Sequence, residues 1–222
     1  MTDRTRPDWI SVLAVLRTVA TRKPSYFFLD KAGIVSAETP APWVYVGPKF
    51  SRGGSPLVLG QNPGVPDRNT PLEADDPVYQ AMARFRDAPL EKLAAAFAEA
   101  NRVQKDAISS WFINDRFYEV AIKASGSSLH DMAILNVVPW RTRDNATPDA
   151  NARAVGMLCL VAPLLEALEP RGIFALGGFP YGGIARHCPE WEEKTCLLPR
   201  RGHGSGRDDL LRKARSFWED LP

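Results

Sequence analysis

The chain has 222 residues, of which 45% are hydrophobic, and a formal net charge of +2. This length and hydrophobic content are enough for one substantial core, so we expect a single domain over residues 1–222. No apolar run reaches the length of a membrane span, and the opening stretch MTDRTRPDW lacks the apolar core of a secretory signal. We therefore expect a cytoplasmic protein with no membrane partner.

The cysteines argue against both a disulfide framework and a metal site. Cys159, Cys188 and Cys196 are odd in number, form no CxxC pair and lack the fourth thiolate of a cysteine-only zinc or iron–sulfur site. Three reduced, mostly buried thiols are expected. A GxGxxG sequence follows no predicted strand, so a dinucleotide is not indicated either. We expect neither a metal nor an organic cofactor.

The first fifty residues are predicted to form a helix and extended segments that pack on the rest of the domain. Apolar residues recur at helical spacing and the helix should end before Pro24. The spaced residues are Ile10, Leu13, Leu16 and Val19. The pieces SYFFLD (25–30) and WVYVG (43–47) favour extended structure.

Strands and helices alternate over the remainder of the chain. Short apolar runs predict strands at Leu57–Gly60 and at three runs ending near Asn136, Gly177 and Pro199. Helical patterns cover Val78–Arg102 with a break near Pro89, Trp111–Ala124, Asp149–Leu168, Tyr181–His187 and Asp208–Asp220. This alternation is typical of an α/β protein, here a three-layer α/β/α arrangement around a mostly parallel four-stranded sheet.

Polar segments rich in Gly and Pro follow three of these strands. They read GQNPG from Gly60, NVVPW from Asn136 and PRRGHGSG from Pro199. Parallel strands end at the same edge of a sheet, and ligands collect there. The three segments are therefore expected to form one site.

The three segments resemble the active-site motifs of the uracil-DNA glycosylase superfamily. The matching residues are Gly60-Gln61-Asn62-Pro63-Gly64, Asn136 and His203-Gly204-Ser205-Gly206-Arg207. The single-strand-selective monofunctional uracil glycosylases have the most similar pattern, with Asn-Pro-Gly in the first motif, a Pro three residues after the strand Asn, and an Arg four residues after the His. The motifs run from Gly60 to Arg207, about two thirds of the chain.

The resemblance implies a base pocket and a water site. Asn62 would orient the attacking water, since an amide is no base, and Gln61 would offer its backbone N–H to a pyrimidine carbonyl. Asn136 would pair with O4 and N3–H of uracil, a pattern that cytosine reverses. Each Asn also has a structural alternative: Asn62 can cap its turn, and Asn136 can satisfy loop backbone.

The last motif would act on the leaving base and the DNA. His203 would donate a hydrogen bond to the base O2 as negative charge develops there, or be an ordinary surface residue. Arg207 would enter the duplex or form a surface salt bridge, Ser205 would hold phosphate, and Gly64 would let backbone approach the ligand or serve the turn.

Other candidates rest on residue type alone. Arg141, Arg143 and Arg201 could bind phosphate or be solvated surface residues; Arg201 belongs to a basic stretch between Leu198 and Ser216. An aromatic ring should cover the extruded base. Tyr79 is the candidate for this ring, with Trp111 and Phe112 as alternatives, and all three are equally consistent with core positions.

We therefore expect a monomeric, monofunctional DNA glycosylase that removes uracil or a related deaminated base in base excision repair. No well-placed lysine indicates a lyase step. Two alternatives remain at this stage: a catalytically weak or inactive relative that binds DNA or a modified base, and a hydrolase of free nucleosides or nucleotides.

Overall fold

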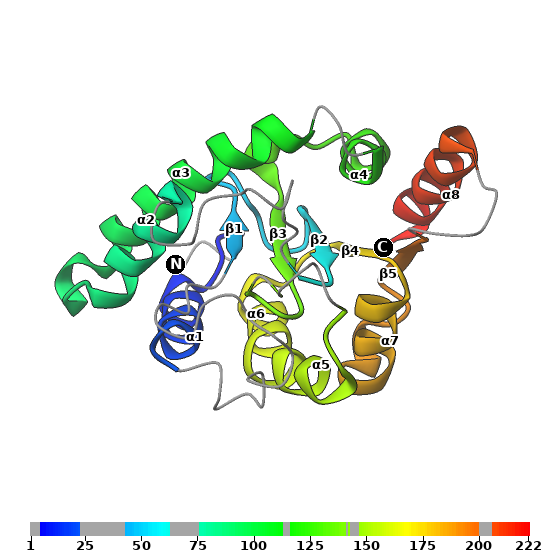
Figure 1. Ribbon diagram of the computed structural model, residues 1–222. Coiled ribbons are helices and arrows are strands. Elements are labelled where there is room, and N and C mark those ends of the chain that lie inside the picture. Colours follow the sequence, from blue (N-terminus) through cyan, green and yellow to red (C-terminus); the bar gives the residue numbers. More distant parts are fainter. Residues whose placement is uncertain are drawn as a thin grey trace.

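The computed structural model describes residues 5–22, 43–62, 76–112, 116–140, 142, 147–199 and 206–222. Side chains of residues 110–112 and 116 lie outside this description. The described part is an α/β protein with helices on both faces of one sheet (Figure 1).

The sheet has five strands in the order β1-β3-β2-β4-β5. They are β1 (Val44–Val46), β2 (Pro56–Gly60), β3 (Ala133–Asn136), β4 (Gly172–Leu176) and β5 (Thr195–Leu198). Strands β2, β3, β4 and β5 run parallel to one another, as predicted. Strand β1 pairs antiparallel with β3. The expected count of four strands was therefore wrong. The fifth strand, β1, comes from the WVYVG piece. Three of its residues pair with the backbone of β3 and form an edge strand.

Helices cover the two faces of the sheet in separate groups. They are α1 (Trp9–Thr21), α2 (Pro77–Asp87), α3 (Leu93–Phe112), α4 (Arg116–Ser125), α5 (Ala150–Gly156), α6 (Ala162–Leu168), α7 (Gly178–His187) and α8 (Arg207–Asp220). Helices α3, α4 and α8 lie on one face, and α1, α5, α6 and α7 on the other (Figure 1). Short 3-10 turns occur at Leu90–Lys92, Leu129–Asp131 and Pro189–Trp191.

Local sequence signals explain where several helices begin. The carboxylate of Asp8 accepts a hydrogen bond from the N–H of Ser11 at 3.2 Å and caps α1. Asp76 caps α2 in the same way through the N–H of Val78, with Pro77 in the first turn. The predicted break near Pro89 is confirmed, because α2 ends at Asp87 and α3 begins at Leu93.

One continuous helical stretch, Ala150–Leu168, joins α5 and α6 through a π-helical turn at Met157–Val161. Its 19 residues have a mean hydropathy of 1.4 over the most apolar window, long and apolar enough to cross a membrane on those two criteria. The sequence expectation that no run reaches this length was therefore wrong. Half of the window is buried inside the fold. A core helix of a folded domain meets the same criteria of length and hydropathy.

Candidate active site

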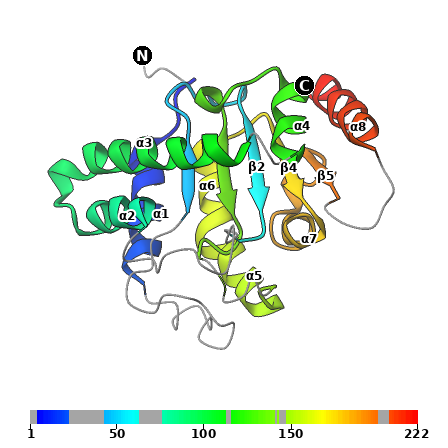
Figure 2. The same ribbon diagram turned by 45° about the horizontal axis from the view of Figure 1, so that its top comes forward.

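The first two motifs lie side by side at the carboxyl ends of β2 and β3. Gly60, the last residue of β2, pairs in register with Asn136, the last residue of β3. Backbone pairing continues past the strands, since the N–H of Val137 donates to the carbonyl of Gly60 at 3.0 Å and that of Val138 to Gln61 at 2.9 Å. The two arrowheads point to the same end of the sheet (Figure 2). The predicted juxtaposition of these segments is confirmed.

The side chain of Asn136 occupies the space beside Gly60. A Cβ atom added to Gly60 would lie 2.4 Å from Oδ1 of Asn136, a distance that non-bonded atoms do not tolerate. Asn136 is 8% exposed, and its side-chain amide forms no hydrogen bond to any residue in the described ranges. An amide that is mostly buried and still reachable from outside can exchange water for a ligand, so this group is the strongest ligand-binding candidate at the sheet edge. A side chain at position 60 would therefore force the Asn136 amide to move.

The Asn62 amide joins the loop after β2 to the loop after β3. Its Nδ2 donates to Oγ1 of Thr142 at 2.9 Å, and its Oδ1 accepts from Nε2 of Gln61 at 3.0 Å. Thr142 is fully buried, whereas Gln61 and Asn62 are half-buried. These two bonds fix the orientation of the Asn62 amide.

Thr142 was not anticipated from the sequence. It stands between two arginines in a polar segment, where a hydroxyl carries no distinctive signal. The only usable sign was its place six residues after Asn136, in a loop that returns to the sheet edge. Its burial and its bond to Asn62 make it a positioning residue of the candidate site.

A second close backbone contact lies just beyond the end of β3, between helix α5 and Val137. A Cβ atom at Gly156 would lie 2.0 Å from the carbonyl oxygen of Val137, the residue after Asn136. Helix α5 therefore presses directly against the strand end, and the π-helical turn begins at the next residue, Met157. Such turns occur often at functional sites because they let a helix adjust to a local contact.

The N-terminus of α7 opens next to this edge. The helix begins at Gly178 immediately after β4, three residues before the predicted start at Tyr181, and Gly177 before it has a positive φ of 98°. No side chain caps the first turn, and a Cβ at Gly178 would meet nothing within 4 Å. Backbone N–H groups of a helix N-terminus favour anions.

Tyr79 lies in the core. It is 2% exposed, and its ring packs against Trp43 with ring centroids 6.4 Å apart. The structure thus favours the core alternative for Tyr79 over a role in stacking on a base. Trp111 and Phe112 belong to the last turn of α3, and their side chains lie outside the described residues.

Arg207 is the first residue of α8 and forms an ion pair with Glu119 on α4. A hydrogen bond from Lys123, together with the charge of Arg207, lowers the pKa of Glu119. The Arg207 side chain is 51% exposed, so this is the surface salt bridge that the sequence left open.

The remaining predicted site residues lie outside the described ranges. They are Gly64, Arg141, Arg143, Arg201, His203 and Ser205. Strand β5 ends at Leu198. His203 lies between Pro199 and Gly206, the residues at which the described ranges end and begin again. Their assigned roles stay predictions.

The described residues contain no cluster of three or more His, Cys, Asp or Glu side chains that could hold a metal ion. Cys188 and Cys196 are buried, and burial raises the pKa of each thiol to about 11, whereas Cys159 is exposed. Two of the three thiols therefore have the expected burial, and neither of these two is poised as a thiolate nucleophile.

A scan of the chain against protein-family models gave no match, and a search among curated proteins found no significant match.

Proposed function

We propose that the chain is a monofunctional DNA glycosylase with a uracil-DNA glycosylase-like three-layer α/β/α fold. It would hydrolyse the N-glycosidic bond of uracil or a related deaminated base in DNA. The observation that carries the proposal is the buried Asn136 amide, which lies against Gly60 at the edge where Asn62 also lies. The proposal also depends on the motif resemblance described above.

Base recognition is assigned to Asn136. Its amide offers a donor and an acceptor together, which match O4 and N3–H of uracil and mismatch cytosine. Discrimination of this kind is strong when the site is buried, because the wrong base leaves a desolvated polar group without a partner. The 8% exposure of Asn136 meets that condition. A base would have to be extruded from the DNA to reach it.

The hydrolytic step is assigned to a water held by Asn62. The bond from C1′ of the sugar to the base nitrogen breaks, a bond from C1′ to the water oxygen forms, and the water proton passes to solvent. The base departs with the bonding electron pair. Asn62 cannot remove the proton, so its contribution is orientation, and the hydrogen bonds from Gln61 and to Thr142 fix its amide for that task.

Charge stabilisation and DNA contacts fall to groups around this edge. His203 would hydrogen-bond the base O2, a role that rests on the resemblance alone. The uncapped first turn of α7 would hold a DNA phosphate. When DNA binds, Arg207 would leave its ion pair with Glu119 and contact a DNA phosphate.

A second candidate is a relative of the same fold that binds a modified base without turnover. The specific observation in its favour is that both ends of the Asn62 amide already have side-chain partners. In that case the first motif would serve to join two loops, and only Asn136 would contact ligand.

An alkaline-cleavage gel distinguishes the two candidates. Labelled oligonucleotides would carry uracil opposite guanine, uracil opposite adenine, uracil in a single strand, hypoxanthine or xanthine. The variants are Asn62→Ala, Asn136→Ala and His203→Ala, and the matched controls are Asn151→Ala, an exposed Asn on α5, and His187→Ala on α7.

Strand cleavage after alkali that is lost in the three site variants and kept in the two controls supports the glycosylase. Intact strands with retarded mobility on a native gel, abolished only by Asn136→Ala, support the binding protein. Cleavage that survives Asn136→Ala with its base preference unchanged overturns the assignment of base recognition.

A further inference from the structure

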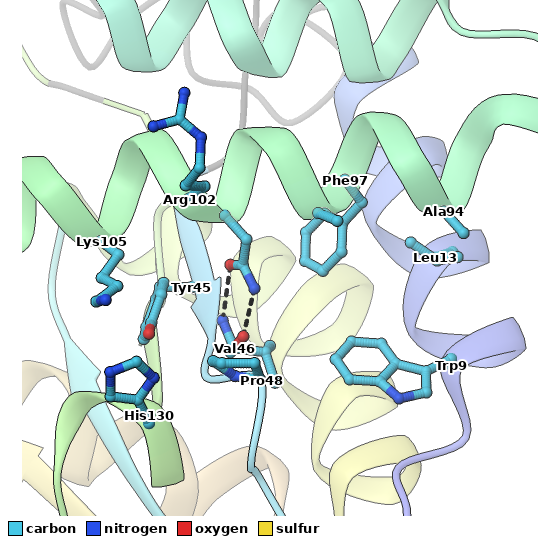
Figure 3. Close-up of a pocket in the computed structure, with 12 residues that line it drawn as sticks. Trp9, Leu13, Tyr45, Val46, Pro48, Ala94, Phe97, Arg102, Lys105 and His130 are labelled. Carbon is cyan, nitrogen blue, oxygen red and sulfur yellow. Dashed lines mark hydrogen bonds between the residues drawn. The ribbon is translucent and has the colours of Figure 1, made fainter.

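A pocket of about 420 Å³ lies between α1, α3 and the end of β1. Figure 3 shows two unlike ends: Trp9, Leu13 and Phe97 line one, and Lys105 and His130 lie at the other. Its volume falls within the range of small-molecule sites in proteins. It lies away from the candidate active site, because Val46 in its floor pairs with Ala133 at the start of β3, whereas Asn136 ends that strand. Strand geometry separates the two by roughly 10 Å.

The apolar end is built by two aromatic rings. Trp9 and Phe97 lie 6.2 Å apart between ring centroids, tilted by 55°, and Phe97 is fixed from behind by Phe85 at 5.4 Å. Phe97 is 3% exposed, so this wall is part of the core and does not have to be ordered on binding. Two rings set at an angle offer one face and one edge to a flat apolar body.

The polar side chains in the middle of the pocket are bonded to backbone groups of the protein. The Asn101 side chain accepts from the N–H of Val46 at 3.0 Å and donates to its carbonyl (Figure 3). The Tyr45 hydroxyl donates to the carbonyl of Leu129 at 2.9 Å. A ligand that is apolar along its centre leaves these bonds intact.

The polar end holds Lys105 and His130, two side chains that can face an acidic group of a ligand. Among the described residues, the side chains of Lys105 and His130 have no ion-pair or hydrogen-bond partner. Arg102 at the same rim is already paired with Glu99 at 2.8 Å and Asp106 at 3.4 Å. Lys105 is half-buried, which makes its charge more effective than that of a solvated lysine.

We propose that this pocket binds a small organic anion with a flat aromatic body and one terminal acidic group. The body lies against Trp9 and Phe97, and the acidic group faces Lys105 and His130. Charge complementarity and the apolar centre select this class over neutral solutes and over molecules with several polar groups.

The test uses a fluorescent anion of this class, 8-anilinonaphthalene-1-sulfonate, titrated into the full chain. Displacement is then measured with 1-naphthaleneacetate and with the neutral 1-naphthalenemethanol. Ala98→Trp fills the pocket from an exposed position on α3, and Ala95→Trp adds the same side chain to that helix outside the lining. Lys105→Glu reverses the rim charge, with Lys92→Glu as its matched control. Thermal unfolding of every variant verifies the fold.

We expect one saturable site that Ala98→Trp abolishes and Ala95→Trp retains. Lys105→Glu should weaken the naphthaleneacetate affinity about fivefold and leave the neutral analogue unchanged, since only the anion uses the charge. No saturable binding, or binding equal in all folded variants, overturns the proposal. So does sedimentation showing that the wild-type chain pairs through this face and Ala98→Trp does not, because a second copy would then be the occupant.

Discussion

The two ends of β3 are built in opposite ways. At the carboxyl end, backbone approaches so closely that Cβ atoms at Gly60 and Gly156 would lie 2.4 and 2.0 Å from their neighbours. At the other end, large aromatic side chains enclose about 420 Å³ of open space. Polar groups that must be held still are fixed by close backbone and short side chains, whereas an apolar body needs room and a rigid wall. The predictions below test this contrast, starting with the largest effect.

Gly60→Ala should slow the proposed base excision about a hundredfold. The new methyl group would displace the Asn136 amide, and a shift of about 1 Å in a positioned group costs roughly a hundredfold in rate. Single-turnover excision of uracil measures the effect. Gly182→Ala on α7, whose Cβ would meet nothing closer than 3.6 Å, is the control and should keep the wild-type rate. Equal rates for both variants would show that the Asn136 position does not matter.

Gly156→Ala should lower the stability of the same end without touching a ligand. The added carbon would overlap the Val137 carbonyl, so α5 or the strand end must move, at a cost of about 1–3 kcal/mol in the free energy of unfolding. Urea denaturation measures it. Gly182→Ala should instead be neutral or slightly stabilising, because alanine favours a helix. A fully stable Gly156→Ala would mean that the helix contact is easily relaxed.

Thr142→Val should slow excision about tenfold while the chain remains folded. It removes the hydroxyl that accepts from Asn62 and keeps the side-chain shape, so the loss corresponds to about 1 kcal/mol of hydrogen bonding. Thr142→Ser restores the hydroxyl and should restore most of the rate. The decisive readout is kcat with KM unchanged, since Thr142 orients the amide and does not bind the base. A change confined to KM would contradict this role.

Glu119→Gln should strengthen DNA binding about two- to threefold at low salt. The substitution releases Arg207 from its ion pair, and a rim charge acts mainly on salt-dependent association. Fluorescence anisotropy at two salt concentrations measures it. Glu99→Gln makes the same charge change next to Arg102 on α3. An equal increase in DNA affinity in both variants would show that the change in net charge, and not the release of Arg207, is responsible.

Ala98→Trp should leave excision unchanged, within about twofold, because the filled pocket lies at the opposite end of β3 from Asn136. The rate is compared with that of Ala95→Trp. A lower excision rate in Ala98→Trp alone would show that the pocket and the Asn136 end of β3 are functionally coupled.

The sequence was sufficient to predict the elements that periodicity and breakers define. The four parallel strands and the break between α2 and α3 follow from apolar runs bounded by Gly and Pro, whereas α3 continues to Phe112, ten residues beyond the predicted end at Arg102. The meeting of Gly60 with Asn136 follows from parallel pairing alone.

Features that depend on contacts distant in the chain were not predictable. The extended structure of Val44–Val46 was predicted, but three residues are too few to reveal the antiparallel pairing with β3 that adds them to the sheet. Thr142 acquires its role through Asn62, eighty residues earlier. Tyr79 is in the core because α2 turns its ring toward Trp43, which spacing from the first motif does not reveal.

Among the residues that the structure describes, β1 pairs with β3 alone, so its other edge could pair with another chain. At Val46 the Asn101 side chain from α3 prevents this, because its amide bonds to both the N–H and the carbonyl of that residue. One amide group thus takes the place of a sixth strand. The exposed end of the sheet is closed at this point to the edge-to-edge pairing by which β proteins aggregate.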